Sequence, residues 1–93
     1  LEDDIYFLQA KIFKKTLRFE EALQKLEIIE KNYKSDILGD DAAFLTAQIY
    51  EENLGDKQKA MELYNKFLLD FPSSIYTAEA RKRYRVLRGD TLN

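Results

Sequence analysis

The feature that most constrains the fold is a self-similarity of the chain at a spacing of about 37 residues. Small and aromatic residues recur in the same order: Tyr6, Ala10, Phe13 and Leu17 precede Ala43, Ala47, Tyr50 and Leu54 by 37 positions, and Ala22, Leu26 and Ile29 precede Ala60, Tyr64 and Phe67 by 38. Repetition at such a period is typical of architectures built by stacking one supersecondary unit. A third step of 37 leads to Ala80, Tyr84, Leu87 and Thr91, so the chain also begins a third copy.

Apolar spacing near 3.6 residues predicts helices and no strand, hence an all-α fold. We expect five helices, over about 3–15, 18–33, 40–53, 56–71 and 73–88. The connections are short, which favours antiparallel packing of successive helices.

Capping and turn residues set the expected boundaries of these helices. We expect Asp40 and Asp56 to cap the third and fourth helices, because a carboxylate accepts hydrogen bonds from the free amides of a first turn. Gly55 and Gly89 can provide turns after the third and fifth helices. Pro72 disfavours helical geometry in the residue before it and so ends the fourth helix.

The repeated small residues predict close packing of helices. Ala10 and Ala47 allow paired helices to approach from one side, and Ala22 and Ala60 from the other. The aromatic positions of the first helices then fill the space between pairs. A large side chain at any of these alanines would overpack the contact, at a cost of about 1–3 kcal/mol.

The order small residue, aromatic, Gly-Asp, Ala60, Tyr64, Phe67 and Pro72 resembles the tetratricopeptide repeat. The resemblance implies a short right-handed α-solenoid of helix-turn-helix repeats, with residues 1–34 and 35–72 as two repeats and 73–93 as a half-repeat or capping helix and tail. Residues 40–74 match best. Leu17 stands where the family usually has a small turn residue and Lys34 where it often has proline. The spacing exceeds the usual 34 by three residues in the 35–40 connection, with one more inserted near 53–54.

A narrower likeness joins the LLDFPSS ending and the following Ala- and Arg-rich helix to repeats of bacterial envelope proteins, such as Tol-Pal-associated periplasmic factors and outer-membrane assembly lipoproteins. It would imply a periplasmic location, while a cytoplasmic one stays open. The chain starts at Leu1, which suggests a fragment of a longer protein. No apolar run approaches the ~20 residues that span a bilayer, so we expect no membrane insertion.

Composition argues against an enzyme. With no Cys and no His, the chain has no thiol nucleophile, imidazole base or zinc-finger ligand set. We predict no metal and no cofactor. The net charge of −2 combines a neutral segment 1–34, a segment 35–72 of net −5 and a segment 73–93 of net +3, a layout that favours charge-matched contacts.

The family resemblance implies that a concave surface, lined by first-helix residues, binds an extended or helical peptide or protein segment. The 37-residue offset identifies three rows of candidates for this protein-binding site: Phe7, Phe44 and Arg81; Lys11, Gln48 and Arg85; Lys14, Glu51 and Arg88. Aromatic rings beside cations suit a peptide groove, because rings supply buried area and cations supply orientation. The alternative is that Phe7 and Phe44 pack under neighbouring helices.

The arginines of the fifth helix also allow two interpretations. They could receive acidic side chains or a terminal carboxylate, or they could form a solvated face. The rows do not reproduce the carboxylate clamp of chaperone-binding repeats, because Gln48 and Glu51 stand where other groups are wanted.

A structural role is the second hypothesis. The fifth helix lacks a second-helix partner and should expose Tyr76, Ala80, Tyr84 and Leu87. Such a strip would support stacking within a larger protein or formation of a homo-oligomer.

Three other motifs favour no function. Glu51 and Glu52 are adjacent and point about 100° apart on a helix, so they are not a catalytic carboxylate pair but a solvated edge. The adhesion tripeptide at 88–90 falls where a helix ends. The RKRYR run at 81–85 lacks the broad basic surface of a nucleic-acid-binding protein.

Overall fold

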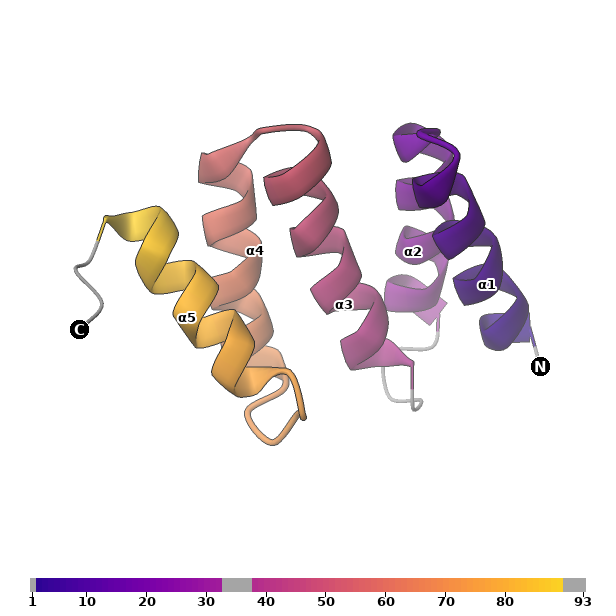
Figure 1. Cartoon of the computed structure of the whole chain (residues 1–93). Coiled ribbons are helices and arrows are strands. Elements are labelled where there is room, and N and C mark those ends of the chain that lie inside the picture. The colour runs from indigo at the N-terminus through magenta and orange to yellow at the C-terminus, as the bar shows by residue number, and fades with distance from the viewer. Residues whose placement is uncertain (1, 33–37, 90–93) are drawn as a thin grey trace.

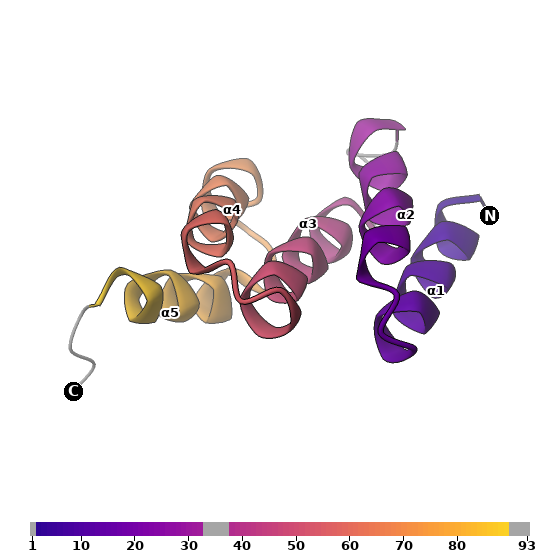
Figure 2. The same cartoon turned by 90° about the horizontal axis from the view of Figure 1, so that it is seen from above.

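A computed structural model describes residues 2–32 and 38–89. They form α1 (Glu2–Lys15), α2 (Phe19–Asn32), α3 (Gly39–Gln48), the π-helical turn η1 (Ile49–Asn53), α4 (Lys57–Asp70) and α5 (Thr77–Arg88). The predicted all-α fold of stacked helix pairs is therefore confirmed. In Figures 1 and 2 the first helices of the pairs, α1, α3 and α5, lie in one layer, and α2 and α4 lie behind them in a second layer.

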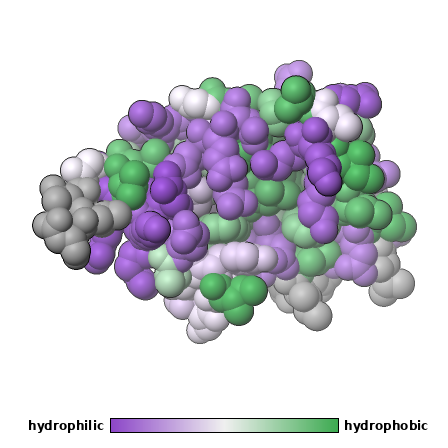
Figure 3. Space-filling view, viewed as in Figure 1, coloured by the Kyte–Doolittle hydropathy of each residue, from purple (hydrophilic) through white to green (hydrophobic). Residues whose placement is uncertain are grey.

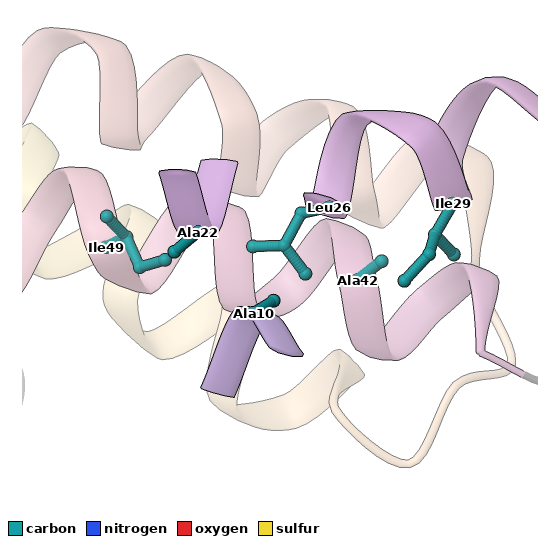
Figure 4. Packing of buried hydrophobic residues seen from close by; sticks show 6 residues of the cluster. All are labelled: Ala10, Ala22, Leu26, Ile29, Ala42 and Ile49. Atoms are coloured by element: carbon teal, nitrogen blue, oxygen red, sulfur yellow. The ribbon is translucent and has the colours of Figure 1, made fainter. Parts of the chain in front are cut away.

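The repeated small residues are where the helices meet. Ala10, Ala22, Ala47 and Ala60 are fully buried, as predicted. One cluster joins the first pair to α3, and Figure 4 shows Leu26 of α2 lying between the helices that carry Ala10 and Ala42. The second cluster joins α3, α4 and α5 around Tyr64 and Phe67.

Helix α1 ends in a Schellman turn. The amide of Leu17 donates to the carbonyl of Lys14, and the amide of Arg18 donates to that of Phe13. Leu17 has φ +65°, the left-handed conformation that favours glycine. Leu17, which replaces the usual small turn residue, is therefore strained, but the turn still forms.

The extra residue of the second repeat lies in η1. Tyr50 corresponds to Phe13, and its carbonyl accepts from the amide of Asp56, six residues on instead of five. The amide of Leu54 donates to the carbonyl of Ile49, a π-type bond. Gly55, at φ +65°, therefore takes the place of Leu17 at an offset of 38. The third helix was expected to be α-helical to residue 53, but it is π-helical from Ile49.

Two other predicted boundaries are wrong and two are confirmed. Asp40 does not cap α3: the helix starts at Gly39 behind Leu38, which makes no side-chain cap. The fifth helix starts at Thr77 rather than near 73, because residues 72–76 form turns. Asp56 does cap α4, accepting from the amide of Lys59 at 3.0 Å, and Gly89 ends α5 with φ +95°.

The acidic start of α3 instead holds the turn before α5. Asp40 accepts a hydrogen bond from the Ser74 hydroxyl at 2.6 Å, and Asp41 accepts one from the Tyr76 hydroxyl. The ring of Tyr76 stacks on Phe44, with centroids 4.6 Å apart. Its bond to Asp41, together with burial, raises the pKa of Tyr76 to about 12. These contacts fix where α5 begins.

Candidate surface for protein binding

The register of α5 differs by one residue from the sequence prediction. Leu38 and Tyr76 both precede their helices with nearly the same backbone angles, and their carbonyls accept from the amides of Ala42 and Ala80. Both alanines are fully buried. The true offset from α3 to α5 is therefore 38, so the predicted rows are rotated by about 100° on α5.

This rotation changes which α5 residues continue the predicted rows. At an offset of 38, Lys82 follows Phe44 and Val86 follows Gln48. The predicted Arg81, Arg85 and Arg88 are exposed, but they occupy the positions that Ala43, Ala47 and Tyr50 hold on α3. On α3 that face packs with α4. Sequence reasoning missed Lys82 and Val86 because it carried the offset of 37 across η1.

The two phenylalanines of the predicted surface lie differently. Phe44 is only 6% exposed and contacts Tyr64, Phe67 and Tyr76, so it is a core residue. Phe7 is half-buried against the first cluster, and the Lys11 ammonium lies 4.9 Å from its ring centroid. The packing interpretation holds for Phe44, whereas Phe7 keeps part of its ring at the surface.

Glu51 is held within the chain. Its carboxylate accepts hydrogen bonds from the Tyr64 hydroxyl at 2.9 Å and from two nitrogens of the Arg83 guanidinium, and its side chain is 10% exposed. The expectation of a solvated edge is wrong for this residue. Lys14 lies 3.7 Å from Glu52, which ties α1 to η1.

Glu51 and Arg83 form an ion pair in which both side chains are charged. Burial by itself raises the pKa of Glu51, but the hydrogen bonds from Arg83 and Tyr64 outweigh it and hold that pKa below its usual value. Burial and the bond to Glu51 raise the pKa of the Tyr64 hydroxyl. The cluster is therefore ionised at Glu51 and Arg83, and it clamps η1 between α4 and α5 rather than offering a free carboxylate.

The set predicted for self-association is not an exposed strip. Ala80 is fully buried, and Tyr76, Tyr84 and Leu87 are half-buried against the second cluster. These side chains pack on α4 because the offset of 38 turns them inward. The structure thus contradicts the expectation that these four side chains form an exposed strip.

A hollow between the second helices was not predicted. It is open to solvent, has a volume of about 240 Å³ and is lined by Leu23, Glu27, Glu30, Thr46, Tyr50, Lys59 and Leu63. Thr46 donates to the Glu30 carboxylate at 3.0 Å, yet burial raises the pKa of Glu30 above its usual value. The spacing of residues 23, 27 and 30 on one face of α2 was the available sequence signal.

Figure 3 shows the face formed by the first helices. Hydrophilic side chains cover its middle, and hydrophobic surface gathers at the α1 end. Within the described residues no group of acidic side chains is arranged to hold a metal ion. None of the helices described is long and apolar enough to cross a bilayer. Asp90 of the 88–90 tripeptide and much of the 35–40 connection lie outside the described residues.

Comparison with known proteins identifies one segment of this fold. Residues 41–74 match the family model described as tetratricopeptide repeat, which supports such a repeat over α3, η1 and α4. Repeats of this family generally mediate protein–protein interaction and generally carry no catalytic activity. No match was found among curated proteins or among solved structures. The boundaries predicted for the other units, the likeness to envelope proteins and the absence of nucleic-acid binding stay predictions.

Proposed function

We propose that the chain is a non-catalytic module that binds a peptide segment of another protein on the surface of α1, α3 and α5. The observation that carries the proposal is the tetratricopeptide repeat at residues 41–74 within a stack of helix pairs. In such solenoids the first helices line an extended concave binding surface.

The chemistry of this surface favours an extended segment with apolar and acidic side chains. After correction of the α5 register, the surface carries the half-buried Phe7, the exposed Lys11, the half-buried Gln48, and the exposed Lys82 and Val86. Phe7 and Val86 offer apolar area, and the two ammonium groups offer charge to a carboxylate. Arg83 neutralises the Glu51 carboxylate, so this carboxylate does not repel an acidic segment.

A charge-reversal pair tests the proposal. An array of immobilised peptides with apolar and acidic residues identifies a binding peptide, whose affinity is then measured in solution by fluorescence anisotropy. Lys82→Glu should weaken binding about tenfold or more, because an attraction becomes a repulsion. Lys57→Glu, an exposed lysine on α4, is the matched control and should leave affinity unchanged.

Two results would contradict this function. Equal loss of affinity in both variants would show that net charge, not the first-helix surface, attracts the peptide. The absence of any binder in an array that spans acidic, basic and apolar peptides would remove the function itself.

A structural role, as a stacking or self-associating element, is the second candidate. The feature that favours it is an exposed apolar face on α1: Ile5, Leu8 and Ile12 are 56%, 56% and 51% exposed. This role moves from α5, where it was first expected, to the opposite end of the stack.

A further inference from the structure

The exposed apolar residues of α1 form one continuous stripe. Ile5, Leu8 and Ile12 lie at i, i+3 and i+7, which places them on one helix face, and we refer to them as the α1 stripe. The opposite face of the helix carries Ala10, which is fully buried in the first cluster. Among the described residues, the other large apolar side chains that are exposed lie singly on α4, on α5 and in three turns.

The equivalent face of α3 shows what such a stripe contacts. At the offset of 37, the stripe corresponds to Ala42, Leu45 and Ile49. Ala42 and Ile49 are fully buried and Leu45 packs beside them, in the cluster that joins α3 to α2 (Figure 4). The α1 stripe therefore has the positions and residue types of a face that packs on a helix.

The charges of α1 make this face self-complementary. Its first turn carries Glu2, Asp3 and Asp4, and its last turn carries Lys14 and Lys15. Asp4 and Lys11 are both exposed, seven residues apart, and so lie along the same side of the stripe. Two copies of α1 packed antiparallel about a twofold axis near Leu8 place each Asp4 beside the Lys11 of the other copy.

Head-to-tail stacking of copies is less favourable. The outer face of α5 carries the exposed Arg81, Lys82 and Arg85. Apolar side chains of a second α1 would bury these charges without a partner, which costs free energy. A symmetric contact through α1 buries apolar area on both sides and closes after two copies.

We propose that the α1 stripe is the interface of a symmetric dimer with a second copy of this chain, with the two α1 helices antiparallel. The inference rests on the self-association role given above and shares only Lys11 with the proposed peptide surface. Three apolar side chains from each copy make a small contact beside the roughly 1,600 Å² of a standard complex, so we expect a weak dimer that dissociates on dilution.

Molar mass as a function of concentration tests the dimer. Sedimentation equilibrium should show the mass rising from 11.0 kDa toward twice that value with increasing concentration. Leu8→Glu should raise the dissociation constant about tenfold or more, because two charges would meet in the apolar contact. Leu69→Glu, at an exposed leucine of α4, is the matched control and should leave the dissociation constant unchanged. Both sites are exposed, and circular dichroism verifies that both variants remain folded.

A charge swap tests the antiparallel orientation. Asp4→Lys alone and Lys11→Glu alone should each be more monomeric than the unchanged chain, because like charges then face each other across the axis. An equimolar mixture of the two variants should form a heterodimer. A mixture that stays monomeric while the unchanged chain dimerises would overturn the proposed orientation.

Other outcomes identify which inference fails. A dimer that is insensitive to Leu8→Glu overturns the α1 stripe but retains self-association, and a monomer at every concentration overturns both. A chain that binds a synthetic peptide of residues 19–32 through Leu8, and does not dimerise, would assign the stripe to the second helix of another repeat. Peptide binding by the Lys82 surface is measured separately and survives any of these results.

Discussion

At the scale of single residues, Leu17 and Leu54 are similar in sequence but differ in backbone geometry. Both follow a first helix, and both are exposed, at 73% and 45%. Leu17 has φ +65°, whereas Leu54 has φ −96° because Gly55 takes the left-handed position. A side chain in that conformation costs about 1–2 kcal/mol, so the two sites should respond oppositely to glycine.

We therefore predict that Leu17→Gly stabilises the protein by about 0.5–1 kcal/mol and that Leu54→Gly destabilises it by a similar amount. The first change relieves strain in the folded state, and the second only adds freedom to the unfolded chain. Urea denaturation measures both. If Leu17→Gly lowers stability as much as Leu54→Gly does, the leucine at 17 makes contacts that outweigh its strain.

Glu51 gives a prediction for acid. Its pKa is lowered in the folded state, so its stabilising effect is present above the unfolded value near 4.5 and is lost as the pH falls through the folded value. We predict that Glu51→Gln is less stable than the unchanged chain at neutral pH and that the difference shrinks below about pH 4.5.

Glu30 provides a control of opposite sign. Burial raises its pKa, so its ionised form opposes folding above the folded pKa, and this cost disappears as the pH falls through that value. Glu30→Gln should therefore be more stable than the unchanged chain at neutral pH, with an advantage that shrinks in acid. Urea midpoints across this pH range measure both variants, and identical pH profiles would contradict the assignment.

At the scale of elements, η1 absorbs one inserted residue without changing the repeat on either side. Removal of Leu54 leaves Tyr50 to Asp56 with the same spacing as Phe13 to Arg18, whose end is a regular Schellman turn. The π-helical turn therefore accommodates one extra residue locally. Without that residue, the chain can form the regular Schellman turn seen after α1.

We predict that deletion of Leu54 yields a folded, helical protein with an unfolding free energy within about 1 kcal/mol of the original, since regular helix bonds replace those of η1. Deletion of the exposed Asn65 is the control. It rotates the end of α4 by about 100° and displaces Phe67 from the core, so it should unfold the protein. Circular dichroism and urea denaturation distinguish the two, and equal damage would show that η1 is required.

At the scale of the whole molecule, α5 covers one side of the second cluster. Ala80 on its inner side and Tyr76 in the turn before it pack with Phe44, Tyr64 and Phe67, and its outer side is charged. A chain of this length has only about 5–14 kcal/mol of stability, so exposing that cluster to solvent should remove a large part of it.

We predict that a chain ending at residue 72 loses cooperative unfolding and binds a hydrophobic dye. The intact chain with Arg81→Ala and Arg85→Ala should unfold within about 0.5 kcal/mol of the original, because those side chains are exposed. Thermal denaturation of the truncated chain and of the double arginine variant shows how much the apolar side and the charged side of α5 each contribute to stability. A truncated chain that unfolds cooperatively at the original temperature would show that α5 is dispensable.

The sequence by itself determined the helices, the repeat and the buried alanines. These features are local or periodic: Ala10, Ala22, Ala47 and Ala60 recur at fixed spacing, and Asp56 and Gly89 act within one turn of their helix ends. The register of the last helix depended on the tertiary structure, because the turn before α5 is fixed by Asp40 and Asp41 across the fold.

The candidate binding surface and the proposed dimer interface also depended on the tertiary structure. Phe44 and Phe7 occupy equivalent positions, but Phe44 is covered by the stacked ring of Tyr76 from the turn before α5, so burial separates two residues that the pattern treats alike. Glu51 was expected to lie on a solvated edge, but its carboxylate accepts a hydrogen bond from Arg83, 32 residues further along the chain. Spacing along the chain predicts which face of a helix a side chain shares, whereas only the packed neighbours decide whether that face remains open.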